Sequence, residues 1–167
     1  DLTFHVVALT ATADPRPLKY DLPPNVVGFT QIPLQLGPGP SRRPRGLDRL
    51  FDALDAPLDR MLRQGGLADL AAVIDVLAPH RGRLGSQALL ESEDAWRLVQ
   101  RMYERGLPGA SFIDYFWSWR ALMGGLFQML LTPLPPARAY HCISTGYAGL
   151  LAARARIETG RPAFITE

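Results

Sequence analysis

The run AYHCISTGYAGLLAARARIETGRPAFITE, residues 139–167, decides the fold. Its apolar opening, Ala139 to Ile143, predicts a short buried strand, and Pro162 to Thr166 predicts a second one. Between them, Tyr147 to Thr159 is typical of a helix that ends at Gly160. A strand, a helix and a strand in this order form a β-α-β unit over residues 138–167. Such a unit implies a parallel strand pair with a right-handed crossover.

The residues before this unit predict strands first and helices afterwards. Two strands are expected within residues 1–36, at Leu2 to Leu9, which reads as buried, and at Asn25 to Leu34. From residue 47 to 131 the apolar spacing and the capping residues indicate helices. We expect them at Leu47 to Arg63, kinked or divided by Pro57; at Leu67 to Leu77; in a short turn capped by Ser86; at Glu93 to Arg105, capped by Ser92; and at Phe112 to Leu131, capped by Ser111.

Composition and charge narrow the classes of function. The chain has 167 residues, 47% of them hydrophobic, which fits a single globular domain. A net charge of +2 is too balanced for a protein that mainly wraps nucleic acid, so no nucleic-acid partner is expected. One cysteine, Cys142, and three separated histidines, His5, His80 and His141, offer no local metal-ligand pair. We therefore expect neither a disulfide framework nor a metal site.

The helix at residues 112–131 is long and apolar enough to be weighed as a membrane span. Asp114 and Arg120 argue against a span, because a central Arg costs about 2.5 to 3.5 kcal/mol in an inserted helix. A buried helix is the favoured interpretation, and a helix that also meets a membrane or a partner is the alternative. Exposure of Trp117 and Trp119 discriminates between the two.

Polar residues gather where the parallel strands of the β-α-β unit end. Ligands of open parallel sheets bind beyond the carboxyl ends of the strands. This rule selects His141, Ser144, Thr145, Gly146, Tyr147 and Glu167 as the residues that line a ligand edge. Backbone N–H groups at the start of the 147–159 helix could receive a phosphate or a sugar hydroxyl there.

Each of these candidates has a structural alternative. Ser144 or Thr145 could simply cap the helix that follows. His141 could be a general base or a ligand for a sugar hydroxyl, or a buried neutral imidazole satisfied by the backbone. Cys142 falls on the other face of the strand and is expected to be a small core residue. No residue is assigned as catalytic.

A basic loop at residues 37–45 (GPGPSRRPR) is a separate candidate. Clustered guanidinium groups attract anions, so Arg42, Arg43 and Arg45 could bind phosphate or a polyanion. The favoured interpretation is a solvated linker, because no aromatic residues interleave the arginines and nearby Asp48 and Asp52 offset their charge.

Two stretches of the chain resemble a known family. The run PGASFIDYFWSWRALMGGLFQMLL at 108–131, followed by residues 139–167, is similar to the N-terminal region of PelF-type bacterial glycosyltransferases. These are retaining GT-B enzymes of glycosyltransferase family 4, associated with synthesis of the Pel exopolysaccharide. The block STGYAGLLA, followed by TGRP and a strand that ends Thr-Glu, carries most of the resemblance.

The resemblance implies a fold and an activity. The chain would be the truncated N-terminal half of a GT-B fold, a Rossmann-like parallel sheet with a large helical insertion over residues 47–131. It would be the acceptor side of an enzyme that transfers a sugar from a UDP-sugar to a growing exopolysaccharide, without a cofactor or a metal. The donor would be bound mainly by a C-terminal nucleotide-binding domain that this chain lacks, so the chain alone would be inactive.

The resemblance also bears on single residues and on partners. Family members carry a strand of the form hydrophobic-His-x-His, in which His141 matches the first histidine and Ile143 stands at the second. The resemblance therefore transfers no catalytic role to His141. The expected partners are the C-terminal domain and a glycan acceptor in the cytoplasm. The alternative function is a non-enzymatic module that docks on a membrane-bound polysaccharide synthesis or secretion complex at the inner membrane.

Overall fold

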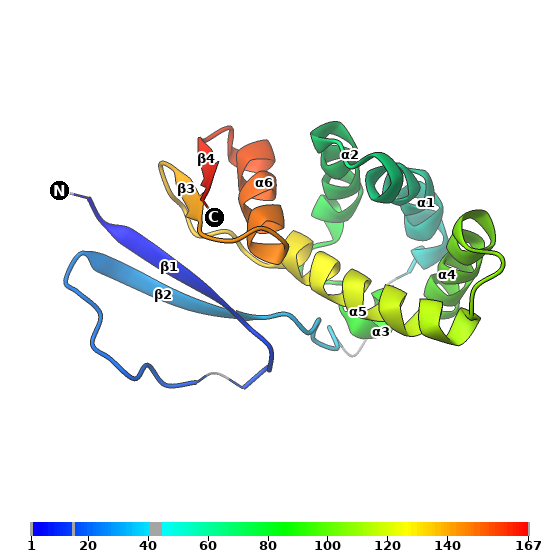
Figure 1. Ribbon diagram of the computed structural model, residues 1–167, viewed down its shortest axis with the longest axis horizontal. Helices are drawn as coiled ribbons and strands as arrows, with labels where there is room; N and C mark the ends of the chain where they lie inside the picture. The colour runs from blue at the N-terminus through cyan, green and yellow to red at the C-terminus, as the bar shows by residue number, and fades with distance from the viewer. Residues whose placement is uncertain (1, 15, 41–44, 167) are drawn as a thin grey trace.

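The computed structural model describes residues 2–14, 16–40 and 45–166, and it shows a mixed α/β chain. Most of its helices lie together at one end, and a long two-stranded ribbon lies at the other (Figure 1). The strands are β1 (Phe4–Thr10), β2 (Val26–Pro33), β3 (Tyr140–Cys142) and β4 (Ala163–Ile165). The helices are α1 (Leu47–Gln64), α2 (Leu67–Leu77), the 3-10 turn η1 (Ala78–His80), α3 (Ser86–Leu89), α4 (Glu93–Gly106), α5 (Phe112–Leu131) and α6 (Tyr147–Thr159).

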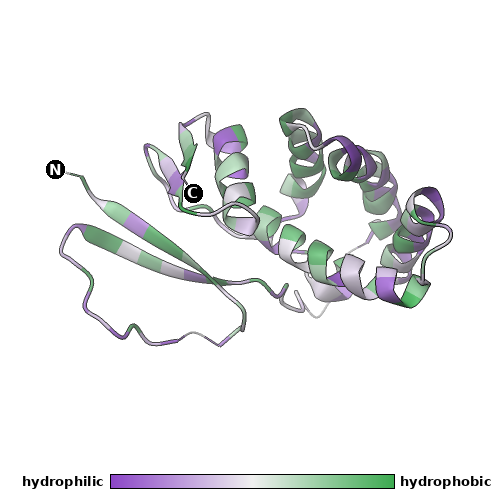
Figure 2. Cartoon of the chain, in the orientation of Figure 1, coloured by the Kyte–Doolittle hydropathy of each residue, from purple (hydrophilic) through white to green (hydrophobic). Residues whose placement is uncertain are grey.

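The hydrophobic core lies among α1, α2, α4 and α5. These helices bury apolar residues at spacings of three and four, as Leu50, Leu54 and Leu58 of α1 show. Figure 2 shows hydrophobic and hydrophilic residues alternating along α1 and α4, whereas α5 is hydrophobic over most of its length. The helical part therefore has a packed interior of its own.

The helices confirm most of the sequence predictions, with two corrections. α1 is one helix through Pro57, so the division expected there as the alternative to a kink does not occur. The residues on both sides of it, Leu54 and Leu58, are fully buried, so packing outweighs the hydrogen bond that proline cannot donate. Ser86 is the first residue of α3 rather than its cap; the capping position is Gly85, and no side chain caps this helix. Ser92 and Ser111 do cap α4 and α5, accepting from the backbone N–H groups of residues 95 and 114.

The strands form two separate parallel pairs among the described residues, not one Rossmann-like sheet. β1 pairs with β2, and β3 pairs with β4. The expectation of a buried first strand is wrong, because Phe4 is 48% and Val6 37% exposed. The expectation of a buried strand after residue 139 is also wrong, since His141 is exposed and its neighbours are half-buried. Apolar composition predicted burial, but each sheet has only two strands and no layer covers both of its faces.

A close approach of two glycines joins the β1–β2 ribbon to the helical part. The chain after β2 brings Gly39 against the backbone of Gly85, where a side chain on either residue would overlap the other backbone. The Ser86 backbone N–H donates to the Gly37 carbonyl over 2.7 Å at the same place. The ribbon is therefore held at its end next to α3.

The long helix α5 divides its aromatic residues between the core and the surface. Trp119 is 4% exposed and its indole N–H donates to the Met102 sulfur over 3.4 Å, whereas Trp117 is 61% exposed. The two tryptophans thus support different interpretations of this helix. Within the described ranges, no helix combines the length and apolar character that a membrane crossing requires.

Candidate functional site

The carboxyl ends of β3 and β4 meet at one edge of their sheet. The two strands run parallel, with Tyr140 opposite Ala163 and Cys142 opposite Ile165. The loop 143–146 therefore leaves the sheet beside Thr166, whose backbone N–H donates to the Cys142 carbonyl over 3.0 Å. The parallel pair and the helix that crosses between its strands confirm the β-α-β prediction.

His141 is exposed at this edge and is paired with a threonine. Its Nε2 lies 2.9 Å from the Thr166 hydroxyl. The alternative of a buried imidazole satisfied by the backbone is wrong, because His141 is exposed and its partner is a threonine hydroxyl. Thr166 was expected only as the end of its strand; its pairing with His141 follows once the parallel register is known. Cys142 is half-buried, with its thiol 3.6 Å from the Phe164 carbonyl.

Ser144, Thr145 and Gly146 are exposed in the turn that leads into α6. The Ser144 hydroxyl donates to the Thr145 carbonyl over 3.2 Å, and no side chain caps α6. The interpretation of Ser144 or Thr145 as a helix cap is therefore wrong. The first helical bond runs from the Leu150 N–H to the Gly146 carbonyl, so the N–H groups of residues 147–149 precede the helical ladder. This edge presents hydroxyls, an imidazole and helix N–H donors together.

Tyr147 lies on the other side of its helix, against α5. Its hydroxyl lies 3.2 Å from the Leu122 carbonyl, and its ring covers Gly125 so closely that a methyl group there would overlap it. Burial raises the pKa of this phenol above its ordinary value. Tyr147 thus joins α6 to α5, and Glu167, the last of the predicted edge residues, lies outside the described residues.

The second parallel pair repeats the histidine arrangement. His5 of β1 lies opposite Gly28 of β2, and its Nε2 is 2.7 Å from the Thr30 hydroxyl, two residues further along. His141 lies opposite Phe164 and reaches Thr166 in the same way. The sequence shows His5 only as an isolated histidine, and strand pairing across 25 residues brings its threonine partner to it.

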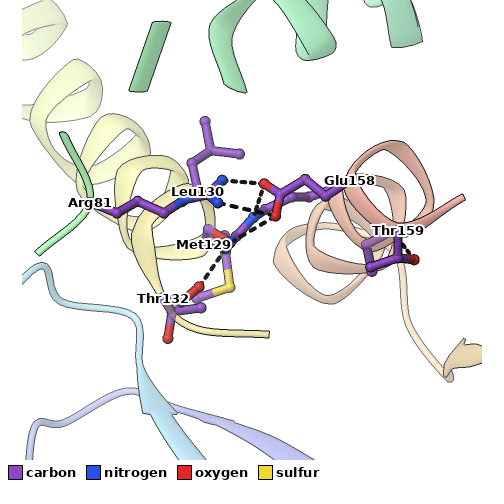
Figure 3. A network of polar contacts seen from close by, with 8 residues as sticks. Arg81, Met129, Leu130, Thr132, Glu158 and Thr159 are labelled. Carbon is purple, nitrogen blue, oxygen red and sulfur yellow. Dashed lines mark hydrogen bonds and ion pairs between the residues drawn. The ribbon is translucent and has the colours of Figure 1, made fainter. Parts of the chain in front are cut away.

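A buried arginine fixes α6 behind the edge. Arg154 is 1% exposed, and its Nη1 donates to the Met129 carbonyl over 2.6 Å and to the Thr132 carbonyl over 2.7 Å. These are carbonyls at the end of α5 that the helix itself leaves unpaired. Figure 3 shows how they gather with Glu158, which accepts from Arg154 Nε over 2.7 Å.

Arg81 completes this cluster from the loop after η1. Its Nε donates to the Leu130 carbonyl over 3.2 Å, and its guanidinium pairs with Glu158 (Figure 3). Burial alone would raise the pKa of Glu158, but hydrogen bonds and charge from the two arginines outweigh it and lower that pKa. Burial lowers the pKa of Arg154. This cluster was missed from the sequence, because nothing near Arg81 or Arg154 in the chain marks either arginine as buried.

The comparisons define the family. The family described as "Domain of unknown function (DUF3492)" matches residues 1–167, and the chain belongs to it. No curated protein and no solved structure matches the chain. Over the described part of the chain, no three or more His, Cys, Asp or Glu side chains form a group that could hold a metal ion.

Proposed function

We propose that the chain is the acceptor-side domain of a retaining glycosyltransferase that transfers a sugar from a UDP-sugar to a growing exopolysaccharide. Domains of this family are known in the N-terminal regions of glycosyltransferases. The resemblance of residues 108–131 and 139–167 to PelF-type enzymes supports the finer assignment. A C-terminal domain would bind the nucleotide, and this domain alone would be inactive.

The observation that carries the proposal is the polar edge beyond β3 and β4. His141, Ser144 and Thr145 are exposed there beside the N–H groups of residues 147–149, which precede the helical hydrogen bonds of α6. Exposed hydroxyls and N–H donors suit the hydroxyl groups of a glycan acceptor. The role of the edge would be to hold the acceptor, because the described partners of His141 and Ser144, a threonine hydroxyl and a backbone carbonyl, would not make either a strong base or nucleophile.

Steady-state transfer by the complete enzyme tests this role. We expect the double variant Ser144→Ala, Thr145→Ala to raise the acceptor KM by about tenfold, the loss of two modest hydrogen bonds. Ser118→Ala, an exposed serine on α5, is the matched control and should leave KM unchanged. Unchanged turnover and unchanged acceptor KM in the double variant would contradict the proposal.

A histidine pair sharpens the same test. His141→Ala and His5→Ala each remove an imidazole that is bonded to a threonine in a parallel strand pair. Only His141 adjoins the loop 143–146, so only His141→Ala should weaken acceptor use. An equal loss in both variants would point to a general effect on the strands.

The exposed side of α5 favours a second candidate function. Ile113 is 68% and Trp117 61% exposed, four residues apart on one face of the helix. An apolar stripe of this kind suits docking on a membrane-bound polysaccharide synthesis complex, so that the enzyme would be cytoplasmic and peripheral to the inner membrane. Loss of membrane recruitment in Trp117→Ser, with catalytic constants unchanged, would favour it.

The third interpretation, anion binding by the loop at 37–45, rests on three arginines. Arg42 and Arg43 lie outside the described residues, and Arg45 is exposed. Anion binding by this loop requires an affinity for polyanions that falls steeply as the salt concentration rises.

A further inference from the structure

A pocket of about 200 Å³ opens between α4, α5 and the turn before α4. It is distinct from the edge of β3 and β4. Its walls are aromatic and aliphatic on one side and carry an ion pair on the other. The lining residues are Leu90, Glu91, Ser92, Ala95, Trp96, Val99, Phe116, Trp119 and Arg120.

The aromatic side of the pocket is rigid. Trp96 packs edge-on against Phe116 with ring centroids 5.6 Å apart, and Trp119 is anchored in the core by its bond to Met102. Trp96 also packs edge-to-face with Phe112, with ring centroids 5.5 Å apart, and nevertheless remains 43% exposed. A partly exposed indole held between two other aromatic rings is a surface that a flat, partly apolar ring can stack on.

The polar side of the pocket is a neutralised ion pair. Arg120 donates from Nη1 to the Leu90 carbonyl and from Nη2 to Glu91 Oε1, each over 3.0 Å. These bonds use two of the five guanidinium N–H donors and one of the two carboxylate oxygens, so both groups can bind a further ligand. The Ser92 hydroxyl is already engaged, because it donates to the Ala88 carbonyl and accepts from the Ala95 N–H.

The charge of this pair selects the kind of ligand. The Glu91 carboxylate repels a phosphate or a carboxylate, and Arg120 repels a cation. A neutral ligand with many hydroxyls can accept from Arg120 and donate to Glu91 at once. Sugar rings combine such hydroxyls with an apolar C–H face that stacks on indole.

From this combination we propose that the pocket binds one neutral sugar ring, stacked on Trp96 and Phe116 and held through its hydroxyls by Glu91 and Arg120. The site does not depend on the transfer reaction. In the complete enzyme it would hold a unit of the glycan away from the point of transfer.

The three tryptophans of the chain, residues 96, 117 and 119, report on this site directly. Their indole N–H signals can be followed by ¹H–¹⁵N NMR of the purified protein during titration with cellobiose, chitobiose or maltose. We expect saturable shifts of the Trp96 and Trp119 signals with at least one of these disaccharides, and none of the Trp117 signal, because Trp117 does not line the pocket. Glucuronic acid and glucosamine should bind at least tenfold more weakly.

Paired variants test the assignment of residues. Trp96→Ala should weaken binding at least tenfold, whereas Trp117→Ala, the matched exposed tryptophan, should leave it unchanged. Glu91→Gln keeps the shape of a side chain that is 44% exposed, so it should fold even if Trp96→Ala does not, and it should weaken binding several-fold. The proposal is overturned if none of the three disaccharides gives saturable shifts, if Glu91→Gln binds as tightly as the original protein, or if indole competes better than any sugar. Because binding is measured without transfer, failure here leaves the acceptor role of the β3–β4 edge standing.

Discussion

Valine side chains differ in burial between the helical part and the strands of this chain. Val73 of α2 is fully buried, whereas Val27 of β2 is 69% exposed. In the four strands as described, Ile32 is the one hydrophobic residue that is fully buried. Parallel strands in most proteins are covered on both faces, and these are not. The comparison teaches that the buried apolar residues of the helices contribute most of the folding stability. Each strand pair is held in place by a few contacts with the helical part.

Removing the hydrogen bonds of Arg154 should have the largest effect on stability. Arg154→Met leaves the carbonyls at the end of α5 unpaired and takes one arginine from Glu158, and we expect a loss of about 3 kcal/mol in the free energy of unfolding. Arg156→Met is the matched control on the exposed side of the same helix and should cost less than about 0.5 kcal/mol. Urea denaturation measures both. Equal losses of stability in the two variants would contradict a stabilising role for the buried Arg154 guanidinium.

The second largest effect on stability is expected where the Tyr147 ring of α6 packs on Gly125 of α5. Gly125→Ala forces the Tyr147 ring away from α5 and should cost about 2 kcal/mol. Gly124→Ala places its methyl 3.6 Å from Leu90, an ordinary contact, and should stabilise the helix by up to about 1 kcal/mol. The neighbouring glycines should therefore shift the melting temperature in opposite directions, and a shared sign would contradict the close packing of Tyr147.

The two valines test the opening comparison itself. Val73→Ala should cost about 2 kcal/mol, because it removes two buried methyl groups and leaves a cavity. Val27→Ala should cost about 0.5 kcal/mol or less, because the side chain is already in water. A large loss at Val27 would mean that β2 is covered in solution, which hydrogen exchange of the β1–β2 amides would reveal independently.

The smallest expected effect is a pH dependence. The lowered pKa of Glu158 means that its stabilising contribution is present above the pKa of an unfolded glutamate and is lost as pH falls through the lower, folded value. Glu158→Gln should therefore lose less stability than the original protein as pH falls from the pKa of an unfolded glutamate through the lower folded value. We expect a difference of about 1 kcal/mol or less from one partly exposed carboxyl. Identical pH profiles would contradict the pairing.

Local patterns predicted the helices and the β-α-β unit well. Two helices begin at their predicted caps, Ser92 and Ser111, and α6 ends at the predicted Gly160. These positions were predictable because caps depend only on nearby backbone groups. The continuity of α1 through Pro57 was not predictable in this way, since distant helices bury the residues on both sides of it. Exposure of β1 and β3 was missed for a related reason, because apolar composition does not show whether a layer covers the strand.

The candidate site, too, was predictable only where it depends on the local order of strand and helix. The sequence placed His141, Ser144 and Thr145 at a strand end, which follows from the order of strand and helix alone. It could not pair His141 with Thr166 or His5 with Thr30, and it did not bring Trp96 of α4 beside Phe116 and Arg120 of α5. Nor could it show that Tyr147 faces α5, or that Arg154 is buried among helix-end carbonyls.

The sequence by itself determined the order and kind of the elements, since apolar periodicity, caps and glycines act within a few residues. The tertiary structure alone decided which faces are covered, which polar groups meet, and where pockets open. Those outcomes depend on contacts between segments that are distant in the sequence, such as His141 with Thr166, 25 residues apart, and Arg81 with Glu158, 77 residues apart. No local pattern in the chain carries that information.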